Sequence, residues 1–486
     1  AAMLLFSVAV LGAFSLSTCQ DEPLRAYSPG DVTIGGLFPV HRKTNRGKRH
    51  GPLSCSAYDL ESFLHTQVMI YSIGEVNRRM GEILPNFTLG YDIYDTCGDV
   101  SLAIAATLQL LKNSSDDARG CFVPDGYPSP LGEPKTKVVI GENYSEVSTA
   151  VARVLALPSV AQISYSSTSQ QLSRKLKFPT FLRTISSDEH QTKAIAKLVK
   201  LFNWKTVAIV GSDDEYGKYG SDRIVELLGK SGDVCIEFFD ILPDYFSQNS
   251  LEARAKLAEL LGNINASSAE AIIVFTKDAN VDVIMSAAVE HRLNRTWIAS
   301  DSWSTSTKVS TLPGINQIGE VFGFISKRNE VPGFKDYVTS KFDGTTNAML
   351  EQYLSVYPLC PGQSDPGMEE NCPPASQGDT AGCQDLNCLA TYTDQDTSYN
   401  IYLAVEVIAE ALRHLLKCDG HQCENKGPVS AVEVLLLQEI QKVNITVDDT
   451  HIYFDANGDP SLGYDIVYWS MAESQQGATI KPIGEY

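Results

Sequence analysis

The order of apolar strands and amphipathic helices constrains the fold of this chain more than any other feature. Apolar runs such as Val32–Pro39 and Val160–Tyr165 alternate with helical patterns such as Asp59–Arg79 and Ser145–Leu155. This alternation predicts parallel sheets with helices on both faces. The pattern restarts near Thr206–Val210. Two successive sets of similar size predict two lobes with a cleft between them.

The end of the chain is expected to return to the first set. After a Cys-, Pro- and Gly-rich insert, helices are predicted at Tyr399–Leu416 and Val429–Lys442, followed by a strand at Tyr464–Trp469. Because these helices belong with the first set, the chain crosses between the lobes more than once. A chain of 486 residues is also too long for one core, which agrees with two or three domains.

The charge and the motifs exclude several function classes. The net charge of −20 argues against nucleic acid as a partner, because phosphate binding needs a basic surface. The basic run His41–His50 is interpreted as a solvated loop, with a polyanion site as the alternative. Gly211–Lys218 resembles a phosphate-binding loop, but its glycine spacing is wrong and its acids would repel phosphate. No nucleophile-elbow or zinc-protease motif occurs, so the chain is not expected to be an enzyme.

The N-terminus and the glycosylation sequons indicate a secreted chain. Met3–Leu16 is an apolar stretch of signal-peptide length, and small residues precede Gln20, so residues 1–19 are expected to be a signal peptide. No later apolar run approaches the length of a membrane helix, about 18 residues. Sequons for N-glycosylation agree with secretion. They lie at Asn86, Asn113, Asn143, Asn265, Asn294 and Asn444.

Eleven cysteines strengthen this prediction, because cysteines pair in an oxidising compartment. Cys55 and Cys97 flank the first helix and the second strand, and Cys418 and Cys423 can close a small loop. A metal site at Cys418 and Cys423 is the less favoured alternative. Four cysteines of the insert are expected to form disulfides whose pairing stays open: Cys360, Cys372, Cys383 and Cys388. Two others have no obvious partner: Cys121 and Cys235.

Small hydroxyl residues crowd the end of the strand Val160–Ile163, in the run Ser164–Ser169. Such a strand end offers hydroxyls and unpaired N–H groups to a small anion. Asp188 and, farther along, Asp301 could neutralise a cation beside it. A site with both characters suits a zwitterion such as an amino acid, whereas a polar strand-to-loop turn is the simpler alternative.

Several separate motifs carry a family resemblance. They are, in order, Ser164–Ser169, Phe181–His190, Phe202–Trp204, Gly211–Gly217, Ala299–Trp303 and Asn400–Val405. Together they resemble the ligand-binding domain of class C G-protein-coupled receptors, which include metabotropic glutamate receptors, the calcium-sensing receptor and type 1 taste receptors. The similarity covers roughly Pro29 to Trp469, and Gly211–Gly217 is most like the taste receptors.

The resemblance implies an α/β fold of the bilobal Venus-flytrap kind, similar to periplasmic binding proteins. Two doubly wound, mainly parallel sheets would be joined by a hinge of three crossings. Lobe 1 would comprise residues 20–186 and 326–456, and lobe 2 residues 187–325 and 457–486.

It also implies an amino-acid site. Ser145 and Thr168 match positions that hold the α-carboxylate in the family, and Ser166 would lend its carbonyl to the ammonium. The other positions matching the ammonium site are Asp188, Tyr216 and Asp301. His65 and Thr397 stand where glutamate-binding members have Arg and Lys. We therefore expect a preference for neutral amino acids, or a broad and weak site, over acidic ones.

The partners are implied in the same way. Agonist would close the cleft, and dimers would form through the lobe 1 helices Asp59–Arg79 and Ser101–Lys112, with a second type 1 taste receptor subunit as partner. Cys121 matches the region of an intersubunit disulfide, and Cys235 would pair with a cysteine-rich domain outside this chain. A seven-helix membrane domain, also outside it, would contact the G protein. Relatives also bind chloride or calcium, for which no site is assigned, and no cofactor is required.

Three alternatives stay open. The chain could be another amino-acid- or calcium-sensing class C ectodomain, a secreted periplasmic-type binding module for a different ligand, or a secreted α/β enzyme.

Overall fold

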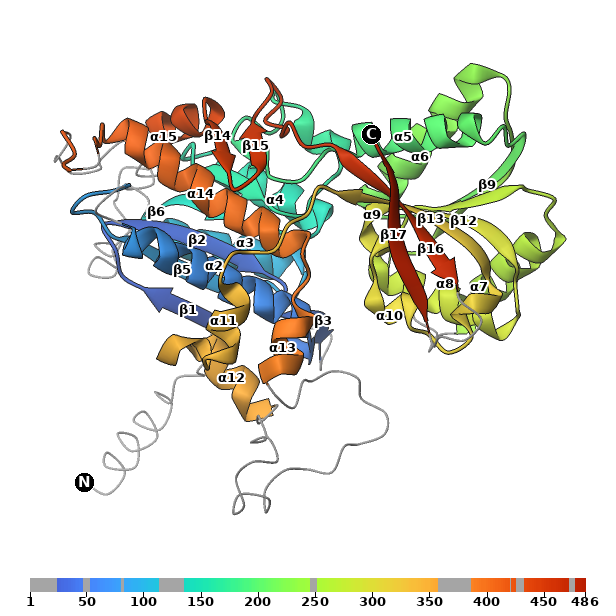
Figure 1. Cartoon of the computed structure of the whole chain (residues 1–486), viewed down its shortest axis with the longest axis horizontal. Coiled ribbons are helices and arrows are strands. Elements are labelled where there is room, and N and C mark those ends of the chain that lie inside the picture. The colour runs from blue at the N-terminus through green and yellow to red at the C-terminus, as the bar shows by residue number, and fades with distance from the viewer. Residues whose placement is uncertain are drawn as a thin grey trace, which may run out of the picture.

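The computed structural model describes residues 24–46, 53–79, 83–112, 135–244, 251–356, 386–419, 421–424, 432–471 and 477–486. The signal peptide expected at residues 1–19 lies outside these ranges. Two large sheets, each with helices on both faces, form two bodies that lie side by side (Figure 1). We call the body around the six-stranded sheet lobe 1 and the body around the seven-stranded sheet lobe 2. The expected Venus-flytrap architecture is confirmed.

Lobe 1 has a sheet in which every neighbouring pair except β1–β5 is parallel. Its central strand β2 (Val32–Phe38) is buried along its whole length, because helices cover both faces of the sheet. Helices α3 and α4 pack on one face, and α2, α14 and α15 pack on the other. The remaining strands of the sheet are β1 (Arg25–Ser28), β5 (Leu89–Asp95), β6 (Thr136–Ile140), β7 (Ala161–Ser164) and β8 (Phe181–Arg183). The helices of lobe 1 are α2 (Leu60–Arg78), α3 (Val100–Leu111), α4 (Ser145–Leu155), α11 (Phe334–Thr339), α12 (Ala348–Val356), α13 (Leu386–Tyr392), α14 (Thr397–Leu415) and α15 (Val432–Gln441).

Lobe 2 has five parallel strands followed by two antiparallel strands at one edge. Helices α5 and α6 cover one face of this sheet, and α7 and α8 cover the other. The strands, in sheet order, are β10 (Cys235–Leu242), β9 (Thr206–Ser212), β11 (Ala271–Val274), β12 (Arg295–Ala299), β13 (Gly319–Ser326), β16 (Tyr464–Met471) and β17 (Ala478–Glu485). The helices are α5 (Asp188–Leu201), α6 (Glu215–Ser231), α7 (Leu251–Ala266), α8 (Asp278–Glu290), α9 (Asp301–Ser304) and α10 (Thr307–Ser310).

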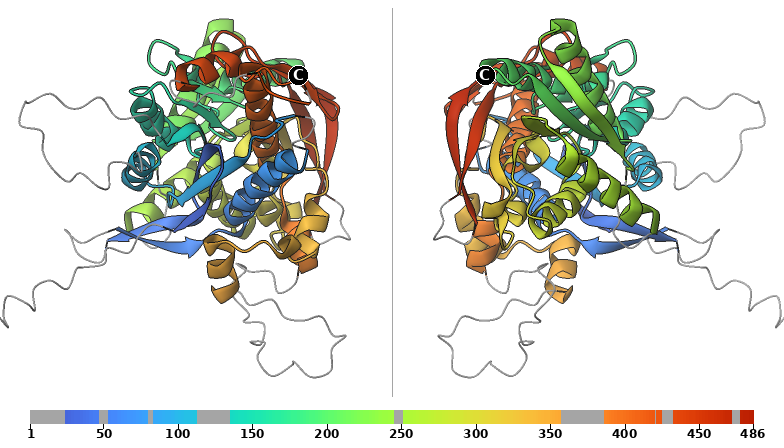
Figure 2. Two further views of the ribbon diagram at one scale, coloured as in Figure 1. Left: turned by 90° about the vertical axis from the view of Figure 1, so that its left-hand side faces the viewer. Right: turned by 90° about the vertical axis from the view of Figure 1, so that its right-hand side faces the viewer.

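Three connections cross between the lobes, at residues 184–187, 327–333 and 454–463. Hydrogen bonds join them to one another. The Ser186 hydroxyl donates to the Leu462 carbonyl at 2.5 Å, and the Lys327 N–H donates to the Gly463 carbonyl at 3.4 Å. In the end-on views of Figure 2, β16 and β17, in red, run along one edge of the molecule. The lobe boundaries expected near residues 186, 326 and 456 stay a prediction.

The loop predicted for the basic run His41–His50 is wrong for residues 41–46, whereas residues 47–50 lie outside the described residues. Residues His41–Arg46 form strand β3, which pairs antiparallel with β4 (Leu53–Tyr58). Arg42 is only partly exposed there, and its guanidinium forms ion pairs with Asp59 of lobe 1 and Asp278 of lobe 2. The sequence of the run predicts a loop because it lacks apolar alternation. The strand forms through backbone pairing with β4, and Arg42 is held by acids elsewhere in the chain. A second small hairpin joins β14 (Asn444–Val447) to β15 (Thr450–Tyr453).

Candidate ligand-binding site

Helix α4 points its N-terminus into the space between the lobes. Ser145 is its first residue and is almost fully buried, and no side chain caps the helix at Tyr144. The Ser145 hydroxyl accepts a hydrogen bond from the Ser169 N–H at 3.2 Å. Free N–H groups and the positive end of the helix dipole make such a position suitable for a carboxylate. The expected role of Ser145 stays a prediction.

Most of the hydroxyls of the Ser164–Ser169 run are used inside the protein. The Ser164 hydroxyl donates to the Glu142 carbonyl at 2.8 Å, and the Ser167 hydroxyl lies 2.7 Å from that of Ser148. Both bonds hold the run against the start of α4. Ser166 is half-buried and Thr168 is buried, so these two stay the candidates for ligand contact. The anion site predicted from the whole Ser164–Ser169 run is therefore reduced to these two residues.

Asp188, Tyr216 and Asp301 converge from three different elements. Asp188 begins α5, Tyr216 lies in the first turn of α6 and Asp301 begins α9. The Tyr216 hydroxyl donates to Asp301 Oδ1 at 2.6 Å, and the Asp188 N–H donates to the Thr168 carbonyl at 2.8 Å. Thus lobe 2 residues reach the same hinge region as the Ser/Thr run. We call Asp188 and Asp301 the hinge acids.

The hinge acids are buried without the partners that charged groups need. Three of their four carboxylate oxygens have no hydrogen-bond partner among the described residues, namely both oxygens of Asp188 and Oδ2 of Asp301. The Gln191 amide nitrogen is buried and unpartnered as well, and sequence reasoning missed this residue. An ionised carboxylate in such surroundings is costly unless a cation or donors reach it.

Titration reflects the same imbalance. Burial raises the pKa of Asp188 well above its ordinary value and the neighbouring Asp301 raises it further, while Arg183 and the Thr168 side chain offset this in part. Burial also raises the pKa of Asp301, against the Tyr216 hydroxyl, the nearby Gln191 side chain and the Ser302 N–H. Arg183 does not neutralise the pair directly, because it donates to Asp459 at 2.7 Å and to two backbone carbonyls at 3.0 Å.

His65 and Thr397 meet at a residue that the sequence did not reveal. Nε2 of His65 lies 2.5 Å from Oδ2 of Asp394, and the Thr397 N–H donates to Oδ1 of the same carboxylate at 2.6 Å. Glu61 lies one helical turn before His65 on α2. We call Glu61, His65 and Asp394 the His65 triad. The Glu61–His65 spacing of four residues on a predicted helix is the signal that could have indicated it.

Charges within the His65 triad balance one another in part. Burial lowers the pKa of His65 while Asp394 raises it, and the net result is a raised pKa. Burial raises the pKa of Asp394, but His65 lowers it, and the net result is a lowered pKa. Although 40% of the Glu61 side chain is exposed, partial dehydration and the nearby Asp394 raise its pKa to about 7. Any ligand side chain here would meet a histidine that already has a carboxylate partner.

The metal-binding potential of the described residues is limited to two groups. Donor atoms of the His65 triad lie within 4.8 Å of one another, but the His65–Asp394 contact occupies the nitrogen that a cation would need. In the second group, Cys97 is already bonded to Cys55. Neither arrangement points to a resident metal.

Two disulfides, Cys55–Cys97 and Cys418–Cys423, join cysteines that were expected to form disulfides. Cys388 is also disulfide-bonded, and Cys235 in β10 is an exposed free thiol. Disulfides of this number fit an oxidising extracellular location. The other five cysteines, Cys19, Cys121, Cys360, Cys372 and Cys383, lie outside the described residues.

The asparagines of the six sequons differ in exposure. Asn143 is half-buried, two residues before Ser145, and Asn113 lies outside the described residues. Four asparagines are exposed, as a glycan requires: Asn86, Asn265, Asn294 and Asn444.

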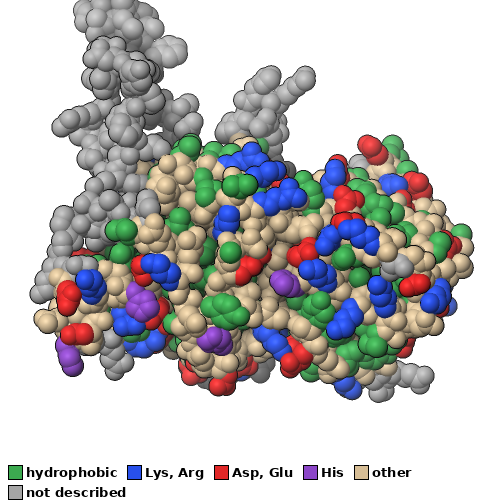
Figure 3. Space-filling view, turned by 90° about the horizontal axis from the view of Figure 1, so that it is seen from above, with side chains coloured by type: hydrophobic (Ala, Val, Ile, Leu, Met, Phe, Trp, Pro, Cys, Tyr) green, Lys and Arg blue, Asp and Glu red, His purple; other side chains and the backbone are tan. Residues whose placement is uncertain are grey.

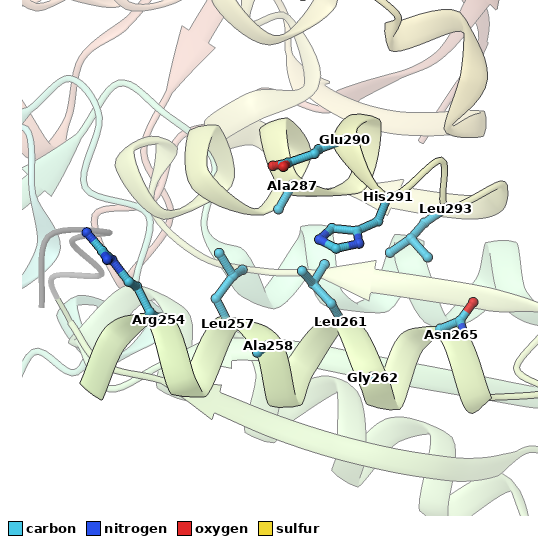
Figure 4. Close-up of a pocket in the computed structure, with 10 residues that line it drawn as sticks. All are labelled: Arg254, Leu257, Ala258, Leu261, Gly262, Asn265, Ala287, Glu290, His291 and Leu293. Carbon is cyan, nitrogen blue, oxygen red and sulfur yellow. The ribbon is translucent and has the colours of Figure 1, made fainter. Parts of the chain in front are cut away.

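A separate cavity of about 660 Å³ lies between α7 and α8 of lobe 2 (Figure 4). Leu257 and Leu261 line it from α7, and His291 and Glu290 lie opposite, with Asn265 at one end. It is open to solvent, and neither hinge acid is among the residues that line it. We therefore do not assign it to the ligand.

The surface and the helices bear on the broad class of protein. On the face in Figure 3, basic and acidic side chains of the described residues are interspersed over both lobes, so this face offers no continuous basic surface for nucleic acid. Among the helices of the described ranges, none combines the length and the apolarity needed to cross a membrane.

Comparison with known proteins places the fold in a family. Residues 65–471 match the family described as receptor family ligand binding region. The chain is 32% identical to G-protein coupled receptor family C group 6 member A of Homo sapiens, over 96% of this chain and 51% of that protein. It is 30% identical to the extracellular calcium-sensing receptor of Sus scrofa, over 95% of this chain and 45% of that protein. It is 28% identical to taste receptor type 1 member 3 of Homo sapiens, over 93% of this chain and 51% of that protein.

The chain thus spans about half the length of the curated relatives it matches. Those relatives are receptors rather than enzymes, which agrees with the lack of catalytic motifs. The chain belongs to the family described as receptor family ligand binding region, and it is a ligand-binding domain of the class C G-protein-coupled receptor type.

Proposed function

We propose that this chain binds an L-α-amino acid in the cleft between its lobes, as the extracellular sensing domain of a plasma-membrane receptor. The observation that carries the proposal is the pair of hinge acids, whose three unpartnered oxygens are buried at the hinge. An ammonium group would supply both the positive charge and the N–H donors that these oxygens lack.

The same ligand would be held at its other charged end by lobe 1. The uncapped N-terminus of α4, with the hydroxyls of Ser145 and Thr168, offers donors to an α-carboxylate. The Ser166 carbonyl would accept from the ammonium. Because the two charged ends would contact different lobes, the ligand would favour the closed cleft by its differential affinity for it.

The ligand's side chain would extend towards the His65 triad. A glutamate side chain would find no free cation there, because His65 is held by Asp394 and Thr397 contributes no charge. Glu61 and Asp394 would also repel it. We therefore propose that neutral amino acids bind more tightly than glutamate.

Calorimetric titration of the chain with alanine, glutamine and glutamate tests this function. Alanine and glutamine are expected to bind, with glutamate weaker by about tenfold because Glu61 and Asp394 would repel its side-chain carboxylate. Glutamate bound much more tightly than glutamine would overturn the side-chain assignment. Absence of binding by all amino acids would overturn the proposed function.

We also propose a taste-receptor role, supported by the similarity to taste receptor type 1 member 3 of Homo sapiens. In that role the chain would pair with a second type 1 subunit through α2 and α3, with Cys121 in an intersubunit disulfide. The exposed Cys235 thiol would bond a cysteine-rich domain that precedes a seven-helix domain contacting the G protein.

The full receptor, expressed alone and with candidate second subunits, separates this role from its alternatives. A response that requires co-expression supports the heterodimer. A response of the receptor alone to amino acids or to calcium would instead favour a receptor like family C group 6 member A or the calcium-sensing receptor.

A further inference from the structure

The start of α8 in lobe 2 lies against lobe 1. Lys277, the residue before the helix, places its ammonium 2.5 Å from Oε1 of Glu146 in α4 and 2.6 Å from Oδ1 of Asp244 in its own lobe. Only 9% of the Lys277 side chain is exposed. This lysine is therefore a buried cation with one carboxylate partner on each side of the cleft.

Glu146 connects this contact to the candidate ligand site. It lies in the first turn of α4 and follows Ser145 directly. Its Oε1 faces Lys277, whereas its Oε2 is buried and has no hydrogen-bond partner among the described residues. Burial raises the pKa of Glu146 and Lys277 counteracts that shift. The charge of this lobe 1 glutamate is therefore stabilised mainly by the lobe 2 lysine.

Other polar contacts between the lobes differ in character from this one. Arg42 reaches Asp278 at 3.0 Å, but about a third of each side chain is exposed, so solvent screens that pair more. The Thr149 hydroxyl donates to Glu215 at 2.8 Å and involves only one charge. The Lys277–Glu146 contact is the most buried ion pair among these.

We propose that Lys277 is a positioning residue for cleft closure, which sets ligand affinity through its bridge to Glu146 without itself binding the ligand. The bridge joins different lobes at 2.5 Å, so an opening of a few ångströms breaks it. Lys277 keeps Asp244 as a partner when the cleft opens. The bridge therefore biases the lobes towards closure and does not lock them.

The affinity part of this inference rests on the proposed function, because apparent affinity scales with the population of the binding-competent closed state. The conformational part does not depend on any ligand. The lobe-to-lobe distance of the ligand-free protein reports it directly.

The experiment measures the distance distribution between one spin label on each lobe, with and without alanine, alongside the alanine Kd. Lys277→Met and Glu146→Gln are each expected to lower the ratio of closed to open protein by about tenfold and to weaken alanine binding by the same factor. The double variant should resemble either single one, because both remove the same contact. Lys277→Arg should retain most of the closed population. Lys308→Met is the matched control, since Lys308 pairs with Asp282 inside lobe 2.

Unchanged basal distances in both single variants, or additive losses in the double variant, would contradict the proposal. If the Kd rises in Lys277→Met while the ligand-free distances stay as in the wild type, Lys277 acts on the ligand and not on closure. If no amino acid changes the distances between the labels in the wild-type protein, the proposed function is contradicted. The distance distribution of the ligand-free variants would still test the role of Lys277.

Discussion

The hinge acids and the His65 triad are two groups of ionisable side chains, and they differ in how far neighbouring groups compensate their charges. The triad contains its own cation, since His65 lies 2.5 Å from Asp394. The hinge acids contain none, and three of their oxygens have no hydrogen-bond partner in the part of the chain that the structure describes. The negative charge of the hinge acids is therefore largely uncompensated, whereas that of the His65 triad is largely compensated.

This difference indicates which part of a ligand each group would recognise. An uncompensated buried carboxylate gains most from an incoming cation, because the cost of its burial is already present in the free protein. A compensated histidine gains little from an incoming anion. The contrast therefore favours recognition of the amino-acid backbone over recognition of an acidic side chain.

Removing a hinge acid should have the largest effect. Asp301→Asn keeps the shape of the side chain but removes the charge, and we expect alanine binding to weaken by about 100-fold, or about 3 kcal/mol. Calorimetry measures this loss. Asp213→Asn is the matched control, because Asp213 is an exposed acid of lobe 2. An Asp301→Asn protein that binds alanine as well as the control would remove the hinge acids from the site.

The pH dependence should follow from the raised pKa values of the hinge acids. Below those raised values at least one acid carries a proton, which an ammonium must displace, so affinity should fall by up to about tenfold per pH unit of acidification. The stability of the ligand-free fold should change in the opposite sense. Between the ordinary value of 3.8 and the raised pKa, the folded chain holds a proton that the unfolded chain has lost, so stability falls as pH rises.

Titrations in buffers of different ionisation enthalpy reveal the proton released on binding, and thermal denaturation follows stability. The account requires proton release that disappears in Asp301→Asn. Binding that is independent of pH, with no proton exchanged, would mean that the hinge acids are already ionised or take no part.

Disturbing the His65 triad should have the smallest effect. Asp394→Asn removes an anion that repels acidic side chains and frees His65, so the glutamate-to-glutamine affinity ratio should rise by about fivefold. The rise should be larger at pH 6 than at pH 8, since burial lowers the pKa of His65 once Asp394 is neutral. Asp394→Glu keeps the charge and serves as the control. No change in the ratio would mean that the ligand side chain does not reach the triad.

The sequence predicts the architecture because its strands and helices have distinct patterns. Buried parallel strands such as β11 are continuously apolar, and α4 was expected with the same ends that the structure shows, Ser145 and Leu155. The hairpin of β3 and β4 was missed, since its strands are basic or polar and pair at the margin of lobe 1. Strand β17 was missed for a similar reason, because most of its residues are exposed.

The residues of the candidate site likewise fall into those that the sequence could predict and those that it could not. Residues carried by motifs, such as Tyr216 and Asp301, could be named in advance, and the structure brings them together. Asp394 and Lys277 could not, because each contacts a partner that is distant in sequence. Asp394 is 329 residues from His65, and Lys277 is 131 from Glu146. Only the fold places such partners beside each other.

The most direct test of the central claim compares alanine with propionate, which lacks only the ammonium group, in calorimetric titrations of the wild-type chain and of Asp301→Asn. If the hinge acids bind an ammonium, propionate should bind the wild type at least about 100-fold more weakly than alanine, and this difference should shrink sharply in Asp301→Asn. Propionate binding as tightly as alanine, or an equal difference in both proteins, would contradict the account.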